Sequence, residues 1–434
     1  MIKALVIFTI VYIAIASEKL PRHWVALGGA LMLLITGVLT PLDAFLAINW
    51  ETLGLLTGMF VLVSILSEAG FFSWLAMSAI RAVNYHPAWL FIALVGLAAG
   101  MAMFIDSITV MMFLTVLTVQ LCRLIKIDPV PMVIAEVCAA NTGGAATLVG
   151  DPPNVILGTS LGFNFGDFAT HTGPISALAA IILVGFFYLS NRQILKDAHT
   201  ALTPEIIQEV DKMHSEPLHR ELTQKGLIAF ILAILLLVFH IPLSDLTGLH
   251  INAATAALVP AVMVMLLLSP RHRKPVLLKV DFQNILFFAG LFIMIGGLEK
   301  AHVFSSLAGL ISANTDMNPS AMVMALHWGP GLLSGMLDNV PLALAMSYIL
   351  KDLALIPGMP ALALMVWSLA LGVDIGGNLT PIGASANVVA YAFVERHHGP
   401  VGWKRWMLIA VPPTLLIMVL ASSLIFLKDI TGWY

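Results

Sequence analysis

The sequence predicts an all-α polytopic membrane protein, built from two inverted repeats that each contain a re-entrant hairpin and a broken transmembrane helix. Three observations predict this fold class: the apolar composition, a glycine-rich string that occurs twice, and the distribution of basic loops. Of the 434 residues, 59% are hydrophobic and only 10% are charged, and the mean hydropathy is +0.97. A water-soluble globule needs more polar surface than this composition supplies. Apolar runs of about twenty residues, enough to span the hydrocarbon core, recur along the chain.

A polar, glycine-rich string occurs twice within otherwise apolar sequence. It reads GGAATLVGDPPNV over residues 143–155 and GGNLTPIGASANV over residues 376–388. Upstream of the strings, Asp106 aligns with Asp338 at an offset of 232 residues, one less than the offset of 233 between the strings. This agreement indicates two copies of one ancestral unit, and duplicated membrane halves with internal breaks are typical of secondary transporters. The residues paired by the offset of 233 are Gly143 and Gly376, Thr147 and Thr380, Gly150 and Gly383, and Asn154 and Asn387.

Lysine and arginine gather in alternate loops, and the side that carries them is expected to be cytoplasmic. Lys19 and Arg22 lie between the first two apolar spans, whereas residues 41–51 contain neither lysine nor arginine. The first repeat is therefore expected to begin outside. The second repeat follows the basic segment 271–279, which is expected to lie inside. The repeats thus enter the membrane from opposite sides, and we predict a multi-pass protein of the cell (inner) membrane.

Eight uninterrupted spans, two further crossings that carry the glycine-rich strings, and two apolar regions with a polar notch are predicted. The first span is expected to be a retained helix, because no clear small-residue cleavage site follows it before Glu18. The regions 89–125 and 320–350 are apolar except for one polar notch each, at Asp106 and Asp338, which fits either a re-entrant hairpin or two full helices. The uninterrupted spans are 3–17, 23–39, 53–80, 173–190, 227–240, 250–268, 282–300 and 407–427.

These elements divide the chain into five segments. The polar stretch between the two halves is mixed in charge and is expected to be a cytoplasmic linker. The segments are 1–49 (N-terminal transmembrane helices), 50–190 (first transport repeat), 191–226 (linker), 227–280 (connecting transmembrane helices) and 281–434 (second transport repeat).

The two strings are candidate binding loops, because unpaired backbone groups are tolerated at membrane depth only around a protein-lined or wet cavity. Pro152 and Pro153 remove amide donors and end the helix ladder. The half-helices on either side then point dipole ends of opposite sign at the gap. Close helix packing is the alternative for glycine-rich sequence in membranes. The predicted substrate-binding residues are Asn141, Gly143, Gly144, Thr147, Asn154, Gly377, Asn378, Thr380 and Asn387 in or beside the strings, with Ser107 and Asn339 at the notches.

Four acidic residues in these regions are candidates for binding a coupling proton or monovalent cation. A lone carboxylate in the bilayer costs several kcal/mol unless it is protonated, paired or solvated. Asp106 and Asp338 occupy equivalent notches. Asp151 lies within the first string, and Asp374 lies just before the second. For Asp106 and Asp338, the alternative role is to cap a helix at a hairpin tip.

Other features exclude several function classes. The motif regions contain no lysine or arginine, which favours a neutral or cationic substrate. Cys122 and Cys138 form neither a disulfide framework nor a zinc site, so no metal or cofactor is expected. A net charge of −3 without a basic stripe gives no reason to expect nucleic-acid binding. An intramembrane aspartyl protease would need a glycine-x-glycine-aspartate string, but the residues before Asp338 read GML, so we expect no enzyme activity.

The strings NTGGAATLVGDPPN (141–154) and GGNLTPIGASANVV (376–389) resemble those of the ion transporter superfamily, in the branch of the arsenite efflux permeases and the melanosomal P protein. Divalent-anion:sodium symporters are more distant relatives. The resemblance runs from about Trp50 to the C-terminus. It implies a midplane site between inverted repeats, a homodimer with an elevator-like motion, and a small inorganic or organic ion as substrate with a proton or sodium as coupling ion. An association with a soluble ATPase subunit is not readable from the sequence.

The branch resemblance implies proton-coupled efflux of arsenite or antimonite. Where the symporters carry Ser-Asn-Thr at their hairpin tips, this chain reads DSI from Asp106 and DNV from Asp338, which fits proton coupling better than sodium-coupled dicarboxylate binding. Uncharged arsenous acid offers hydroxyls that asparagine, threonine and backbone groups can hydrogen-bond. A sodium/proton antiporter and a sodium- or proton-coupled carboxylate (anion) transporter are the nearest alternatives, and an anion channel is a third.

Overall fold

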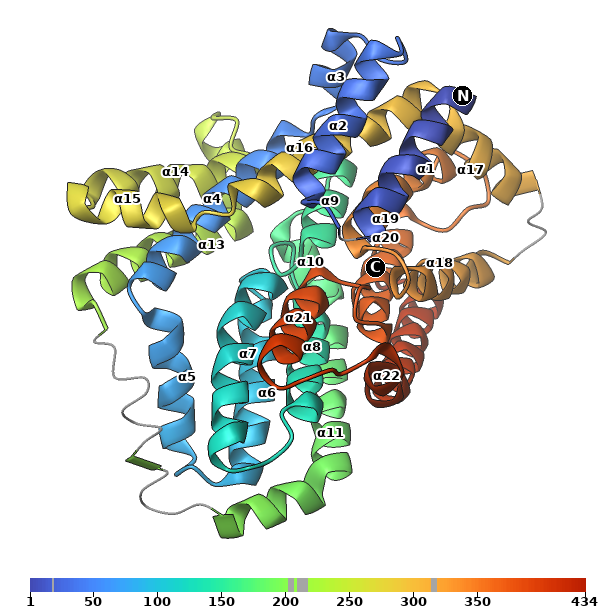
Figure 1. Ribbon diagram of the computed structural model, residues 1–434. Helices are drawn as coiled ribbons and strands as arrows, with labels where there is room; N and C mark the ends of the chain where they lie inside the picture. Colours follow the sequence, from blue (N-terminus) through green and yellow to red (C-terminus); the bar gives the residue numbers. More distant parts are fainter. Residues whose placement is uncertain (18, 202–206, 209–217, 314–317) are drawn as a thin grey trace.

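The computed structural model describes residues 1–17, 19–201, 207–208, 218–313 and 318–434. All regular secondary structure in these residues is helical, as predicted (Figure 1). Among the described helices, seven are long and apolar enough to cross a membrane. They are α4 (Trp50–Glu68), α7 (Ser107–Leu124), α11 (Gly173–Ala201), α13 (Arg220–Thr247), α16 (Phe282–Lys300), α20 (Leu362–Gly376, which reaches 18 residues with the 3-10 turn that follows it to Leu379) and α22 (Trp403–Thr431).

The other described helices are shorter. Nearly every residue of α8, which is one of them, and of the longer α20 is buried, so these two helices form the core around which the rest packs. The shorter helices are α1 (Ile2–Ala16), α2 (Arg22–Ile35), α3 (Pro41–Ala47), α5 (Phe71–Ala82), α6 (Pro87–Ala102), α8 (Val130–Gly144), α9 (Pro152–Leu161), α10 (Phe165–His171), α14 (Ala253–Leu267), α15 (Pro270–Lys279), α17 (Val303–Ala313), α18 (Pro319–Ser334), α19 (Asn339–Leu353) and α21 (Ser385–His397), with a 3-10 turn η1 (Gly377–Leu379).

The sequence repeat is also a repeat of helices. The six helices α4 to α9 have counterparts in α16 to α21, and each counterpart begins 232 or 233 residues later. The correspondence starts earlier than the sequence predicts, because α2 and α14 end 232 residues apart, and so do α3 and α15. The duplicated unit therefore includes helices that the sequence analysis places outside the repeats, in segments 1–49 and 227–280.

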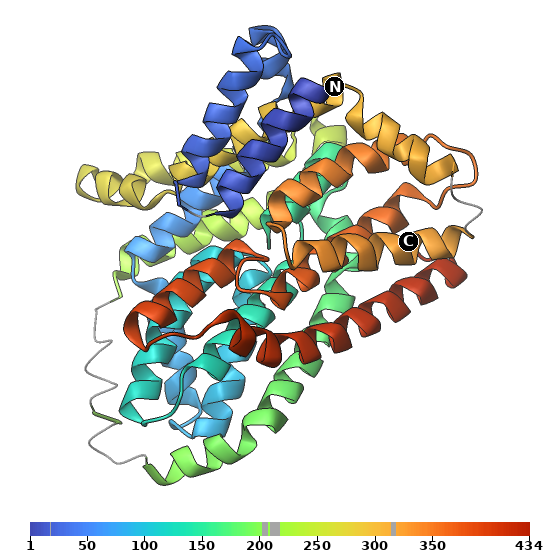
Figure 2. The same cartoon turned by 45° about the vertical axis from the view of Figure 1, so that its right-hand side comes forward.

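The two sets of helices pack on each other reciprocally. Helix α9 packs on α19, and its counterpart α21 packs on α7. Helix α14 packs on α4, and its counterpart α2 packs on α16. Helix α21, drawn in red-orange, lies beside the cyan α7 in Figure 1, and Figure 2 shows the same helices from a second side. An exchange of matching faces is what a two-fold relation between halves produces, and it holds each broken helix against the hairpin of the other half.

One predicted span is wrong. The predicted span 53–80 is two helices, because α4 ends at Glu68 and Gly70 adopts a left-handed φ of 75° before α5 begins. The helices that flank the predicted linker 191–226 extend into it, since α11 continues to Ala201 and α13 already begins at Arg220. Residues 202–206 and 209–217 of that linker lie outside the described residues.

Candidate functional site

Both predicted helix interruptions are present. Between α8 and α9 the chain leaves the helix over residues 145–151, and between α20 and α21 it does so over residues 377–384, apart from the single turn η1. Gly150 and Gly383 lie in these two loops. The ends of four half-helices therefore meet near the centre of the molecule.

An asparagine braces each loop from inside. Asn154 Nδ2 donates to the carbonyl oxygens of Gly144 and Thr147, at 3.1 Å each. Asn387 makes the equivalent two bonds within its own loop, at 2.8 and 2.7 Å. Both asparagines are fully buried. They donate to carbonyl groups at the helix breaks, so their amide donors are already used.

The other polar residues of the strings also bond within the protein. The hydroxyls of Thr147 and Thr380 each donate to a backbone carbonyl at the hairpin tip of their own repeat. Asn141 Nδ2 donates to the side-chain oxygens of Asn378 and Asn387, at 2.9 and 2.8 Å, and so ties the two repeats together. The predicted binding residues that do not line the central cavity described below are Asn141, Gly143, Gly144, Thr147, Asn154, Gly377, Asn378, Thr380 and Asn387.

The aspartates of the two notches cap the helices that begin at the hairpin tips. Asp106 accepts hydrogen bonds from the backbone N–H and the hydroxyl of Thr109, at 2.9 and 2.7 Å, at the start of α7. Asp338 accepts from the backbone N–H of Val340 at 3.0 Å, at the start of α19. The capping role is therefore present, and a role of these two residues in ion coupling stays a prediction.

Asp151 connects the two hairpins through one buried carboxylate. Its Oδ1 accepts from the hydroxyl of Ser107 at 2.6 Å, and its Oδ2 accepts from Asn339 Nδ2 at 3.0 Å. Ser107 and Asn339 are equivalent residues of the two hairpin tips, and all three side chains are 2% exposed. The structure thus brings together three of the predicted site residues, drawn from both repeats.

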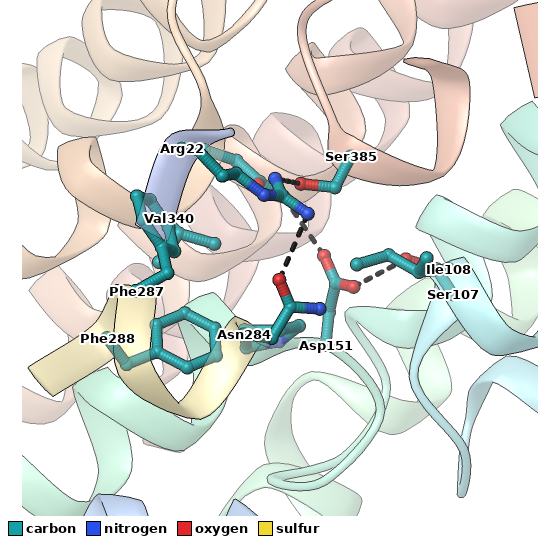
Figure 3. A pocket seen from close by; sticks show the side chains of 11 residues that line it. Arg22, Ser107, Ile108, Asp151, Asn284, Phe287, Phe288, Val340 and Ser385 are labelled. Atoms are coloured by element: carbon teal, nitrogen blue, oxygen red, sulfur yellow. Dashed lines mark hydrogen bonds between the residues drawn. The ribbon is translucent and has the colours of Figure 1, made fainter. Parts of the chain in front are cut away.

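A small cavity, called the central cavity here, separates Asp151 from Arg22 (Figure 3). The Arg22 guanidinium donates to the hydroxyl of Ser385 and, at 3.1 Å, to Asn284 Oδ1, and it lies 3.5 Å from the carboxylate of Asp338. The cavity leaves about 10 Å³ for the centre of a water molecule, which is room for about one water. Its other lining residues are Ser107, Ile108, Pro152, Phe287, Phe288, Asn339 and Val340.

Sequence reasoning missed Arg22, Asn284 and Ser385. The motif regions themselves contain no lysine or arginine, but Arg22 reaches the central cavity from α2, outside these regions. Its counterpart in the other half is Ala254, so the positive charge is on one side of the centre only. A lone arginine in the first turn of an apolar helix is the available signal, although its position near Lys19 between two apolar spans predicts a loop residue.

Replacing Asn387 by alanine is expected to destabilise the fold, and not to weaken substrate binding alone. The change removes two hydrogen bonds to buried carbonyl groups, and each such bond contributes about 0.5–1.5 kcal/mol. We expect a clear fall in the thermal unfolding temperature of the purified protein, while Asn318→Ala, which removes one exposed helix-capping bond, has a smaller effect. An unchanged unfolding temperature with a raised KM would instead support the direct binding role that the sequence predicts.

Comparisons with known proteins agree with a transporter. A family model described as citrate transporter matches residues 12–372. An uncharacterized transporter of Mycobacterium tuberculosis is 33% identical over 98% of both chains, and the P protein of Mus musculus is 28% identical over 98% of this chain and 60% of its own length.

Two solved structures share the fold. The YdaH transporter of Alcanivorax borkumensis has a TM-score of 0.57 at 13% identity, over 93% of this chain and 89% of its own. MtrF of Neisseria gonorrhoeae, described as illuminating a class of antimetabolite efflux pumps, has a TM-score of 0.59 at 14% identity, over 92% of this chain and 84% of its own. At such identities the likeness concerns the fold alone.

Proposed function

This chain belongs to the citrate transporter family, and we propose that it is a secondary active transporter that carries a small carboxylate anion, coupled to H⁺ or Na⁺. Membership in the family makes it a membrane transporter. The substrate class and the coupling are the proposal. The observation that carries it is the guanidinium of Arg22 in the central cavity, between the tips of both hairpins.

Arg22 suits a carboxylate ligand. A guanidinium presents a planar fork of donors that matches the two oxygens of a carboxylate. In this conformation the fork faces Asp338 at 3.5 Å, which is longer than a good charge-assisted hydrogen bond. A substrate carboxylate could replace this loose contact. Ser107 and Asn339 each already donate one hydrogen bond to Asp151, so the hydroxyl oxygen of Ser107 and the second amide hydrogen of Asn339 would bind the rest of the substrate.

Substrate entry requires the central cavity to widen. At about 10 Å³ it is closed to anything larger than water. A second space of about 290 Å³ adjoins it, and Arg22, Asp338 and Ser385 line this space together with Leu20 and Met336. We propose that substrate reaches Arg22 through this second space when the hairpin tip at Asp338 moves.

The arrangement of the halves supports alternating access around this site. We propose that the repeats are inverted, because their packing is reciprocal and their flanking loops differ in basic charge. A homodimer in the cell (inner) membrane with an elevator-like motion is proposed from the resemblance stated above.

Arsenous acid is a second candidate substrate. The neutral hydroxyl and amide groups of Ser107, Asn339, Asn284 and Ser385 around a small cavity favour it. Capture of trivalent arsenic by thiolate is not part of this candidate, because neither cysteine lines the central cavity.

Flux assays on purified protein in liposomes test the proposal. We expect an imposed pH or sodium gradient to drive accumulation of labelled citrate or a smaller dicarboxylate, and unlabelled carboxylates to compete. Arsenite that is accumulated while carboxylates neither accumulate nor compete would select the second candidate. Sodium-dependent proton movement without any other solute would select the antiporter.

A further inference from the structure

Unpaired polar atoms gather where α8, α9 and α20 meet. Of the buried side-chain atoms without a hydrogen-bond partner in the described residues, five belong to four fully buried residues of the two broken helices. Buried polar groups are otherwise almost always bonded, so this concentration needs a reason. The atoms are Asn141 Oδ1, Asn154 Oδ1, both carboxylate oxygens of Asp374, and Asn378 Nδ2.

The pseudo-symmetry of the fold shows what is unusual at Asp374. Asn141 and Asp374 are equivalent at the offset of 233, as are Asn154 and Asn387. On one side, Asn141 Nδ2 donates to Asn387 Oδ1 at 2.8 Å. On the other side, Asp374 occupies the position equivalent to Asn141, but its carboxylate has no N–H to donate. It interacts with Asn154, whose amide N–H groups already bond within the loop.

The result is a buried carboxylate, that of Asp374, without a hydrogen-bond donor. Asp374 also interacts with the carboxylate of Asp151, which accepts from Ser107 and Asn339, so two acidic side chains lie close together beside Asn154. A buried carboxylate without a partner is costly, and a bound positive charge removes the cost. The side-chain atoms that could bind this positive charge are all oxygens. Among the described residues, no cluster of three or more histidine, cysteine or acidic side chains could hold a metal ion.

We propose that Asp374, Asp151 and Asn154 together bind one monovalent cation, H⁺ or Na⁺, and that this cation is the coupling ion of the transport cycle. The proposal rests on the proposed function and adds the ion site to it. Asp151 is the link between the two sites, because its carboxylate also holds Ser107 and Asn339 at the central cavity. Charging or emptying the ion site therefore changes how firmly Asp151 holds both hairpin tips.

The nearby titratable groups are engaged elsewhere. Glu136 on α8 accepts from the hydroxyl of Thr118 at 2.5 Å. The two ring nitrogens of His327 on α18 each lie 3.1 Å from a backbone carbonyl, of Ser368 and Met418. Asp106 faces Asp151 from the first hairpin. The remaining titratable groups on helices packed against α20 are Cys138 on α8, Asp338, Tyr348, Lys351 and Asp352 on α19, and Lys404, Arg405, Lys428 and Asp429 on α22.

The variant Asp374→Asn tests the ion site, because it rebuilds on this side the amide pair that Asn141 and Asn387 form on the other. In liposomes, we expect gradient-driven accumulation of labelled carboxylate to fall at least tenfold more than carboxylate exchange does. A pH gradient without sodium and a sodium gradient at equal pH are separate arms, and the arm that drives the wild type identifies the ion. Glu136→Gln, a second buried carboxylate on a central helix, is expected to keep accumulation.

The outcomes separate the two proposals. If Asp374→Asn accumulates substrate as the wild type does in the driven arm, the ion site is overturned and the transport function stands. If the wild type accumulates no carboxylate in either arm, the proposed function fails first.

If Asp374→Asn does not assemble, the wild type is reacted with a hydrophobic carbodiimide, and the labelled residues are mapped by mass spectrometry. Labelling of Asp374 that falls, relative to that of Glu136, when Na⁺ is added or the pH is raised supports the site. Labelling of Asp374 that responds neither to Na⁺ nor to pH overturns it.

Discussion

Arg22→Ala is expected to raise the KM for carboxylate uptake about 100-fold or more. The change removes the guanidinium that lines the central cavity. Hydrogen bonds to charged groups contribute about 1.5–3 kcal/mol each, so the loss of two amounts to about 3 kcal/mol or more, or a factor of about 100 in affinity. Arg22→Lys keeps the charge without the planar fork and is expected to fall between the wild type and the alanine variant. Uptake of labelled substrate into liposomes measures all three.

Lys300→Ala is the matched control. Lys300 is exposed on α16 and pairs with Asp43, and this pairing together with Thr40 holds the pKa of Asp43 below its usual range. Its removal deletes one positive charge from the surface and is expected to leave KM unchanged, since exposed ion pairs contribute little. A KM for Arg22→Ala within about twofold of this control would contradict the role of Arg22. It would favour a neutral substrate such as arsenous acid, which needs no counter-ion.

Gly143→Ala and Gly376→Ala are each expected to prevent assembly of the protein. A Cβ at Gly143 would overlap the backbone carbonyl of Ala99 on α6, and a Cβ at Gly376 would overlap that of Gly331 on α18. The clash is with main chain, which cannot rotate away as a side chain can. Overpacking commonly costs about 1–3 kcal/mol and more where the neighbour is rigid. We expect loss of the monodisperse peak in size-exclusion chromatography.

Gly100→Ala is the control for this effect. Gly100 lies on α6 next to Ala99, and a Cβ there meets nothing within 4 Å. Alanine also has the higher helix propensity, so this variant is expected to assemble normally. Equal yield and thermal stability of Gly143→Ala and Gly100→Ala would contradict the close packing of the broken helix on the hairpin.

Much of the site could be predicted because its motifs occur twice in the sequence. The strings at Gly143 and Gly376 predict both helix interruptions, since glycine and proline act on the local backbone. The notches at Asp106 and Asp338 predict where the two hairpins turn. Because polar residues are rare in this chain, Ser107, Asn339 and Asp151 stood out, and the structure joins these three.

Long-range packing decided what could not be predicted. Arg22 reaches the cavity because α2 packs on α16, and nothing near Arg22 in the sequence indicates that contact. The extension of the repeat to α2 and α14 was missed for a related reason: both helices are apolar, and packing against lipid or apolar neighbours leaves few positions distinctive. The asparagines of the strings suit binding a substrate or bracing a loop equally well, and only the bonds of Asn154 and Asn387 distinguish these roles.

A density map of the protein in lipid nanodiscs with a bound carboxylate tests the central claim most directly. We expect the two halves to run in opposite directions through the membrane, with breaks over residues 145–151 and 377–384 and substrate density beside Arg22, between Ser107 and Asn339. Continuous helices through Gly150 and Gly383, halves that point the same way, or substrate density remote from Arg22 would contradict the account.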